Sequence, residues 1–230
     1  MASNSEMAQI TTINLAHLPS SLSIHLALFT HVTNASALRS QLLASNPLYD
    51  YAFIDATRIL SPTHILTAVF RACTDYTFSR LRSRNVHSEI VFSLASSNNI
   101  ADALRRWGIT DTTTEVLAIR VVDSRKQGEG QHTHANAETI ARFLGEVVEG
   151  ESVVFGEENL ARVRDVSAIR KVYKLGGGAQ QQQQGKKSKG GVNGSTDGSA
   201  TGAAKSQEGQ DQELKELEIQ ILGLMALKGS

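Results

Sequence analysis

The order of apolar and polar positions divides residues 22–175 into alternating strands and helices. Residues 22–29 alternate strictly, which predicts a strand. Further apolar runs predict strands at 51–55, 116–122 and 152–155. Between these runs, apolar residues recur every three or four positions, which is typical of helices packed on a core. The predicted helices begin near Asn34, Pro62, Glu138 and Asp165.

The stretch Arg80–Ile109 carries the densest set of local signals. Residues 86–94 alternate, and we interpret them as a buried strand with Val86 on one face and His87 and Glu89 on the other. Asn99 suits the N-cap of a following helix at 100–107. Gly108 suits a left-handed C-cap after it.

These elements predict a mixed α+β (α/β) fold, a single layered domain with a small sheet covered by helices. Residues 1–21 form a flexible lead in this interpretation, and residues 22–175 form the domain. Residues 176–210 are rich in Gly, Gln and Lys and predict a disordered insert. Residues 211–230 then form a C-terminal helix that docks on the domain.

The helix after Pro62 is expected to bury Ile65 and its neighbours, with His64 lying off the buried stripe. Cys73 is the only cysteine, so no internal disulfide can form, and it is expected to pack as a small apolar group. No basic leader before an apolar run and no apolar stretch of membrane-spanning length occurs, so we expect a protein of the cytosol or nucleus.

The chain has 23 basic and 23 acidic residues, which excludes a general polyanion binder but allows a local basic patch. Such a patch falls within residues 80–106, where arginines and hydrogen-bonding side chains outnumber carboxylates. It would suit phosphate oxygens and the edges of unpaired bases. A solvated helix face with a charged loop is the alternative interpretation. The residues of this candidate nucleic-acid-binding patch are Arg82, Arg84, Asn85, His87, Asn98, Asn99, Arg105 and Arg106.

The sequence has no motif for catalysis, cofactor binding or metal binding. Within a strand, Ser88 would point away from His87 and Glu89, so these three residues would not form a relay. His132 and His134 are weak metal candidates, because no cysteine or acidic pair accompanies them. We therefore expect a binding subunit without catalytic residues, cofactor or metal. The alternatives are a small hydrolase or acyltransferase that uses His87 or His64, and an interaction scaffold that never contacts RNA.

The segment HSEIVFSLASSNNIADALRRWGI resembles the signature of the PRPK-binding protein family, which comprises TPRKB and its fungal and archaeal relatives. Three other segments, YAFIDATRILSPTHILTAVFRA, AIRKVYKL and LEIQILGLMALKGS, resemble further parts of the same family. Members are small accessory subunits of the KEOPS, or EKC, complex. The loop at 123–136 and the insert at 176–210 are longer than the family core requires.

The resemblance implies a compact α/β fold that binds the atypical kinase/ATPase of that complex. It also implies a part in threonylcarbamoyl-adenosine modification of tRNA, by contact with the tRNA 3′ end, and links to telomere maintenance and transcription. The expected location is nucleus and cytoplasm. On the C-terminal helix, one apolar face is expected to dock on the domain, and a second flank containing Ile219 is expected to face the kinase. The candidate kinase-binding residues are Leu217, Ile221, Leu222, Leu224, Met225 and Leu227.

Overall fold

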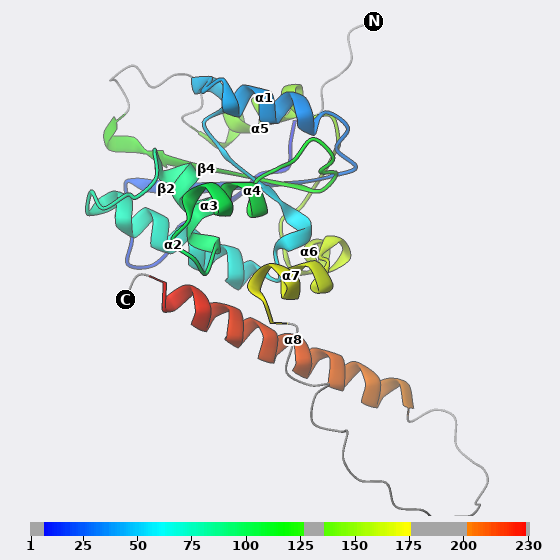
Figure 1. Ribbon diagram of the computed structural model, residues 1–230. Coiled ribbons are helices and arrows are strands. Elements are labelled where there is room, and N and C mark those ends of the chain that lie inside the picture. The colour runs from blue at the N-terminus through cyan, green and yellow to red at the C-terminus, as the bar shows by residue number, and fades with distance from the viewer. Residues whose placement is uncertain (1–6, 127–135, 176–201, 229–230) are drawn as a thin grey trace, which may run out of the picture.

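The computed structural model describes residues 7–126, 136–175 and 202–228. A five-stranded antiparallel sheet lies between two layers of helices (Figure 1). The mixed α+β class expected from the sequence is confirmed. His132, His134 and residues 176–201 of the expected insert lie outside the described residues.

The sheet is built around two long central strands, β2 (Leu22–Thr30) and β4 (Val116–Asp123). They pair over their whole length, from Leu22 opposite Asp123 to Phe29 opposite Val116. The short strands β1 (Thr11–Ile13) and β5 (Glu151–Val153) both pair with β2, and β3 (Ala52–Asp55) pairs with β4. Ala52 is opposite Ile119, so β4 continues beyond the end of β3.

Two hydrophobic cores lie on the two faces of the sheet. One face packs against α1 (Ala35–Leu43) and α5 (Ala137–Val147). The other face packs against a larger layer (Figure 1). That layer contains α2 (Pro62–Thr77), α3 (Val86–Leu94), α4 (Ile100–Trp107), α6 (Glu157–Val163), α7 (Val166–Tyr173) and α8 (Gly202–Ala226). Three short 3₁₀ helices complete the described elements: η1 (Pro47–Tyr49), η2 (Ala56–Arg58) and η3 (Ser124–Lys126).

The strand predicted at residues 86–94 is wrong, because this segment forms the helix α3. The helix contacts α2, α4, β3 and β4, so it is buried on nearly every side. A helix buried all round has no polar face, so its sequence lacks the 3.6-residue period that identifies surface helices. The local signal was the pair Asn85 and Ser88, which form a capping box at the start of α3.

Three smaller predictions also need correction. Gly108 ends α4 with φ −68° and ψ 163°, which is not the left-handed conformation. Its role is close approach, because a Cβ atom there would lie 2.5 Å from the carbonyl oxygen of Leu104. His64 is fully buried, although it was expected to lie off the buried stripe of α2. In addition, α8 begins at Gly202, well before the expected start at Asp211.

Candidate functional site

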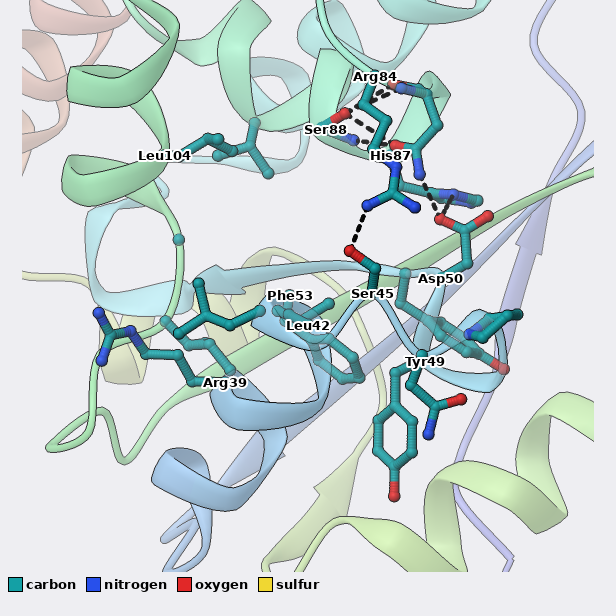
Figure 2. A pocket seen from close by; sticks show the side chains of 18 of the residues that line it. Arg39, Leu42, Ser45, Tyr49, Asp50, Phe53, Arg84, His87, Ser88 and Leu104 are labelled. Atoms are coloured by element: carbon teal, nitrogen blue, oxygen red, sulfur yellow. Dashed lines mark hydrogen bonds and ion pairs between the residues drawn. The ribbon is translucent and has the colours of Figure 1, made fainter.

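A cleft of about 690 Å³ opens between α1 and η1 on one side and α3 and α4 on the other (Figure 2). One part of its lining is apolar and contains Leu42, Leu43 and Leu104. The side chains of Leu43 and Leu104 are 72% and 40% exposed, so they present apolar surface to solvent. The other part is polar and basic. Its charged lining residues are Arg39, Asp50, Arg84, Arg105 and Arg120.

Asp50 organises the polar end of the cleft. Its Oδ1 accepts hydrogen bonds from Asn85 Nδ2 at 2.6 Å and His87 Nδ1 at 3.1 Å. The Arg120 guanidinium donates to the Asp50 carbonyl and lies 3.6 Å from its carboxylate. Burial by itself would raise the pKa of Asp50, but the His87 hydrogen bond and the charge of Arg120 hold it below its ordinary value. Asp50 therefore remains an anion and keeps α3 against the sheet.

The segment that precedes α3, residues 80–84, is here called the basic loop. Arg82 Nη1 donates to the amide oxygen of Asn98 at 3.0 Å, and Arg84 donates to the hydroxyl of Ser45 across the cleft (Figure 2). Both arginine side chains are exposed. Within the described residues neither forms an ion pair, so both charges are available to an anionic ligand.

Arg105 and Arg106 on α4 differ from the basic loop because they share one carboxylate. Arg105 Nη2 lies 2.5 Å from Asp102 Oδ1, and Arg106 Nε lies 2.6 Å from Asp102 Oδ2. The Arg106 and Arg105 contacts lower the pKa of Asp102, which therefore remains charged. Arg105 lines the cleft, whereas Arg106 is outside its lining. The α4 arginines thus add less net charge than the sequence suggests.

The asparagines and His87 from the candidate nucleic-acid-binding patch have structural tasks in this conformation. Asn85 Oδ1 caps α3 and Asn99 Oδ1 caps α4. Asn98 accepts from Arg82. The His87 side chain is buried, and both its ring nitrogens are occupied. The expectation that Asn85 and His87 read bases directly is therefore replaced by a supporting role beneath the arginines.

The two histidines considered as bases for a hydrolase have no free ring nitrogen. His87 Nε2 accepts the backbone N–H of Val121 at 3.0 Å. His64 Nδ1 accepts the backbone N–H of Leu60 at 3.1 Å, and its Nε2 lies 2.8 Å from the Tyr173 hydroxyl. Burial lowers the pKa of His64 to about 3 and also lowers that of His87. Ser88 bonds to Asn85 and Ser83 rather than to His87.

Helix α8 packs against α2 through one apolar face. Leu217, Ile221 and Met225 are buried in the larger core, as expected for the docking face. They were also candidate kinase-binding residues, and their burial removes them from any partner surface in this conformation. Leu222 and Leu224 are half-buried, whereas Ile219 and Leu227 are 70% and 71% exposed. The outer flank of α8 is therefore Ile219, Leu222 and Leu227.

The sequence did not single out Arg39, Ser45, Asp50 or Arg120 as site residues. Arg120 carried a usable signal, because it is an arginine within the β-branched run of β4. Among the described residues no group of three or more His, Cys, Asp or Glu side chains could hold a metal ion. Within the same residues, no helix is long and apolar enough to cross a membrane.

Comparison with known proteins identifies the family. The family model described as "Kinase binding protein CGI-121" matches residues 29–229. The "EKC/KEOPS complex subunit cgi121" of Aspergillus fumigatus is 42% identical over 221 residues, which cover 96% of this chain and 97% of that protein. The protein of the same name in Aspergillus terreus is 40% identical, again over 96% of this chain and 97% of that protein. The chain belongs to the CGI-121 family.

More distant members retain the similarity. The EKC/KEOPS complex subunit of Schizosaccharomyces pombe is 30% identical over 152 residues, which cover 66% of this chain and 82% of that protein. The CGI-121 match includes the cleft, the basic loop and α8. The resemblance to kinase-binding subunits expected from the sequence is thereby confirmed.

Proposed function

We propose that this chain is a non-catalytic subunit of an EKC/KEOPS complex that binds the complex's atypical kinase/ATPase and helps recruit tRNA. Membership in the kinase-binding CGI-121 family and the EKC/KEOPS names of its relatives support this assignment. The tRNA would be bound through its 3′ end and positioned for threonylcarbamoyl-adenosine modification. The observation that carries the tRNA proposal is the cleft together with the adjoining basic loop, whose Arg82 and Arg84 form no ion pair within the described residues.

The chemistry of the cleft suits an unpaired nucleotide strand. Arg84 lines the cleft and Arg82 lies on the same basic loop, and their exposed side chains would bind phosphates. The exposed side chains of Leu43 and Leu104 supply apolar surface for the faces of unstacked bases. Unpaired RNA bases expose their faces and edges to side chains, and this chemistry supports the proposal of a terminal, unpaired segment of RNA.

The outer flank of α8 is the surface that we assign to the kinase. Its three apolar residues lie on a helix whose opposite face is already buried in the domain. Exposed apolar residues grouped on one helix face usually mark a partner site. Of the six candidate kinase-binding residues predicted from the sequence, this proposal keeps Leu222 and Leu227. It adds Ile219.

The non-catalytic part of the proposal rests on hydrogen bonding. A general base needs a ring nitrogen within reach of the proton that it abstracts. His64 and His87 use both nitrogens to hold backbone groups and neighbouring side chains, so neither serves a reaction in this conformation. Through the complex, the proposal extends to telomere maintenance and transcription, and to a location in nucleus and cytoplasm. This extension rests on the family resemblance alone.

The experiment that tests this function is a pull-down from cell extract with both protein and RNA identified. Recovery of the kinase together with tRNA would support it. Purified protein should then bind intact tRNA more tightly than the same tRNA without its unpaired 3′-terminal nucleotides. Equal binding of the two RNAs would contradict 3′-end recognition, and recovery of the kinase without RNA would favour the interaction scaffold. Turnover by the isolated subunit would contradict the non-catalytic assignment.

A further inference from the structure

Lys228 follows α8 and is a buried lysine that neither proposed binding surface uses. Its side chain is 4% exposed. Its Nζ donates to the backbone carbonyl of Phe92 and lies 3.2 Å from the centroid of the Phe92 ring. Phe92 belongs to the last turn of α3, so the ammonium group lies at the negative end of that helix.

The same end of α8 is held by a second cation. Arg71 of α2 donates to the carbonyl of Met225 at 2.7 Å and to the carbonyl of Lys228. Two positive groups therefore lie close together in a partly buried region. Burial, followed by the charge of Arg71, lowers the pKa of Lys228 to about 7. Placing Lys228 there costs free energy of folding, and a buried charge retained at such a cost points to a role beyond packing.

One carboxylate on α3, that of Glu89, favours the charged form of Lys228. Glu89 lies three residues before Phe92, so both residues are on the same face of α3. The Glu89 side chain is 1% exposed, and its charge raises the pKa of Lys228, opposing the effects of burial and Arg71. Within the described residues no side-chain cation contacts the Glu89 carboxylate within ion-pair distance. Lys228 thus supplies positive charge near a buried carboxylate that lacks a direct ion pair.

Glu89 in turn holds the basic loop. Its Oε2 accepts from the backbone N–H of Arg82 at 3.1 Å, from the backbone N–H of Ser83 at 2.7 Å and from the Ser83 hydroxyl at 2.6 Å. The carboxylate binds the backbone of Arg82 but not its guanidinium group, which extends to Asn98 and solvent. Glu89 therefore holds the backbone of Arg82, while Asn98 holds its guanidinium group.

We propose that Lys228 is a positioning residue for Arg82. The Lys228 ammonium group compensates the buried Glu89 carboxylate from the side of α8, and the Arg82 guanidinium group therefore remains directed outward for a phosphate of RNA. Without Lys228, Glu89 attracts the Arg82 side chain inward and the basic loop loses its outward cation. This inference rests on the proposed RNA-binding function of the basic loop.

The test uses the full-length protein with Lys228→Met, which keeps the length of the side chain but removes its charge. Lys215→Met is the matched control, because Lys215 is an exposed lysine on the same helix. Lys228→Met should not lower the melting temperature at pH 7, since it removes a buried charge. It should weaken tRNA binding about threefold to tenfold and reduce the slope of log K against log salt by about one. Lys215→Met should change neither measurement.

A double variant separates positioning from a general loss of charge. Arg82→Gln should weaken tRNA binding in the wild-type background but add nothing in the Lys228→Met background, because Arg82 is already turned inward there. Full additivity of the two changes would overturn the proposal. Unchanged tRNA binding by Lys228→Met would overturn it as well.

Hydrogen exchange provides a readout that does not depend on RNA. Loss of Lys228 should alter the protection of the Arg82 and Ser83 amides, which bind Glu89, but not that of amides in α5. Unaltered protection of both amides would overturn the proposal. If Lys228→Met does not fold, the protection of the Arg82 and Ser83 amides is instead measured in the wild type from pH 6 to 9, relative to amides in α5. Lys228, which lies near Glu89, Arg71 and Arg82, loses its proton in this interval. If wild-type protein does not bind tRNA, the proposed function fails, and exchange at Arg82 and Ser83 alone decides the role of Lys228.

Discussion

The imidazole of His87 accepts a hydrogen bond from the backbone N–H of Val121 at 3.0 Å, on the part of β4 that no longer pairs with β3. β3 begins at Ala52, opposite Ile119, and leaves the edge of β4 uncovered beyond Ile119. His87 occupies this edge from α3, and its other ring nitrogen binds Asp50. A side chain thus continues the hydrogen bonding of the sheet and forms the floor of the cleft.

The first prediction concerns this contact. His87→Asn should lower the free energy of unfolding by about 2–4 kcal/mol, because a shorter side chain leaves the Val121 N–H unpaired and opens space in the core. Urea unfolding checks this value. His31→Asn is the control, since His31 is largely exposed. It should change stability by less than about 0.5 kcal/mol. Equal effects of the two changes would contradict a structural role for His87.

The second prediction concerns tRNA binding by the arginines. Arg84→Glu should weaken binding more than Arg105→Glu, because within the described residues Arg84 forms no ion pair, whereas Arg105 shares Asp102 with Arg106. Each substitution that weakens binding should also reduce the slope of log K against log salt concentration by about one. Filter binding at several salt concentrations measures both quantities.

Arg162→Glu is the matched control for this series. Arg162 is an exposed arginine on α6 that pairs with Glu158 and lies outside the cleft. The Arg162→Glu variant should bind tRNA with the affinity of the wild type. A loss of affinity as large as that of Arg84→Glu would show that the effect is one of net charge rather than of the cleft.

The third prediction separates the two faces of α8. Ile219→Glu and Leu227→Glu should leave the isolated protein folded but prevent co-purification with the kinase, because both side chains are exposed. Ile221→Ala, on the buried face, should lower the free energy of unfolding by about 2–4 kcal/mol. Retention of kinase binding by both glutamate variants would place the contact elsewhere on the molecule.

The fourth prediction concerns acid stability. His25, His64 and His87 are buried, and burial lowers the pKa of each one from its ordinary value of 6.5. The unfolded chain therefore binds protons that the folded protein does not, and stability should fall as the pH drops below 6.5. Each such histidine contributes a slope of up to about 1.4 kcal/mol per pH unit. Urea unfolding between pH 5 and 7 checks this, and unchanged stability over that range would contradict it.

The basic side of the stability curve provides a fifth prediction. The pKa of Lys228 is about 7 in the folded protein, against an ordinary value of 10.5. The unfolded chain holds this proton more tightly between pH 7 and 10, so stability should rise across that interval. Lys228→Met should remove this rise, and urea unfolding of both proteins at pH 7 and 9 measures it. An identical pH dependence of the two proteins would contradict the shifted pKa.

Periodicity predicted helices that have one solvent face, and it also predicted the central strand β2, although β2 is buried on both faces. The strand at 22–29, the helix after Pro62 and the docking face of α8 all agree with the structure. The method failed at α3, because a helix with no solvent face has no polar period. At this segment the capping box that begins at Asn85 indicated a helix more reliably than the alternation of apolar residues indicated a strand.

The candidate site was only partly predictable, for a physical reason. The exposed arginines of the basic loop could be recognised from local charge. Asp50 and Ser45 could not, because the fold, not sequence spacing, brings them to the cleft. Arg120 was recognisable only as an arginine within a β-branched run. Charge counting included Asp102 but underestimated its effect, because Asp102 lies one helical turn before Arg105 and Arg106 and pairs with both of them.

The pairing of β2 with β4 has a consequence for synthesis on the ribosome. Leu22 is opposite Asp123, so the two central strands cannot meet until everything between them has been translated. During that interval α2, α3 and α4 have no sheet to cover, and their apolar surfaces remain available to other chains. Long-range pairing of this kind slows folding and lengthens exposure to aggregation. Synthesis in a chaperone-depleted extract should therefore give more aggregate when elongation is slowed before β4 than when it is slowed after it.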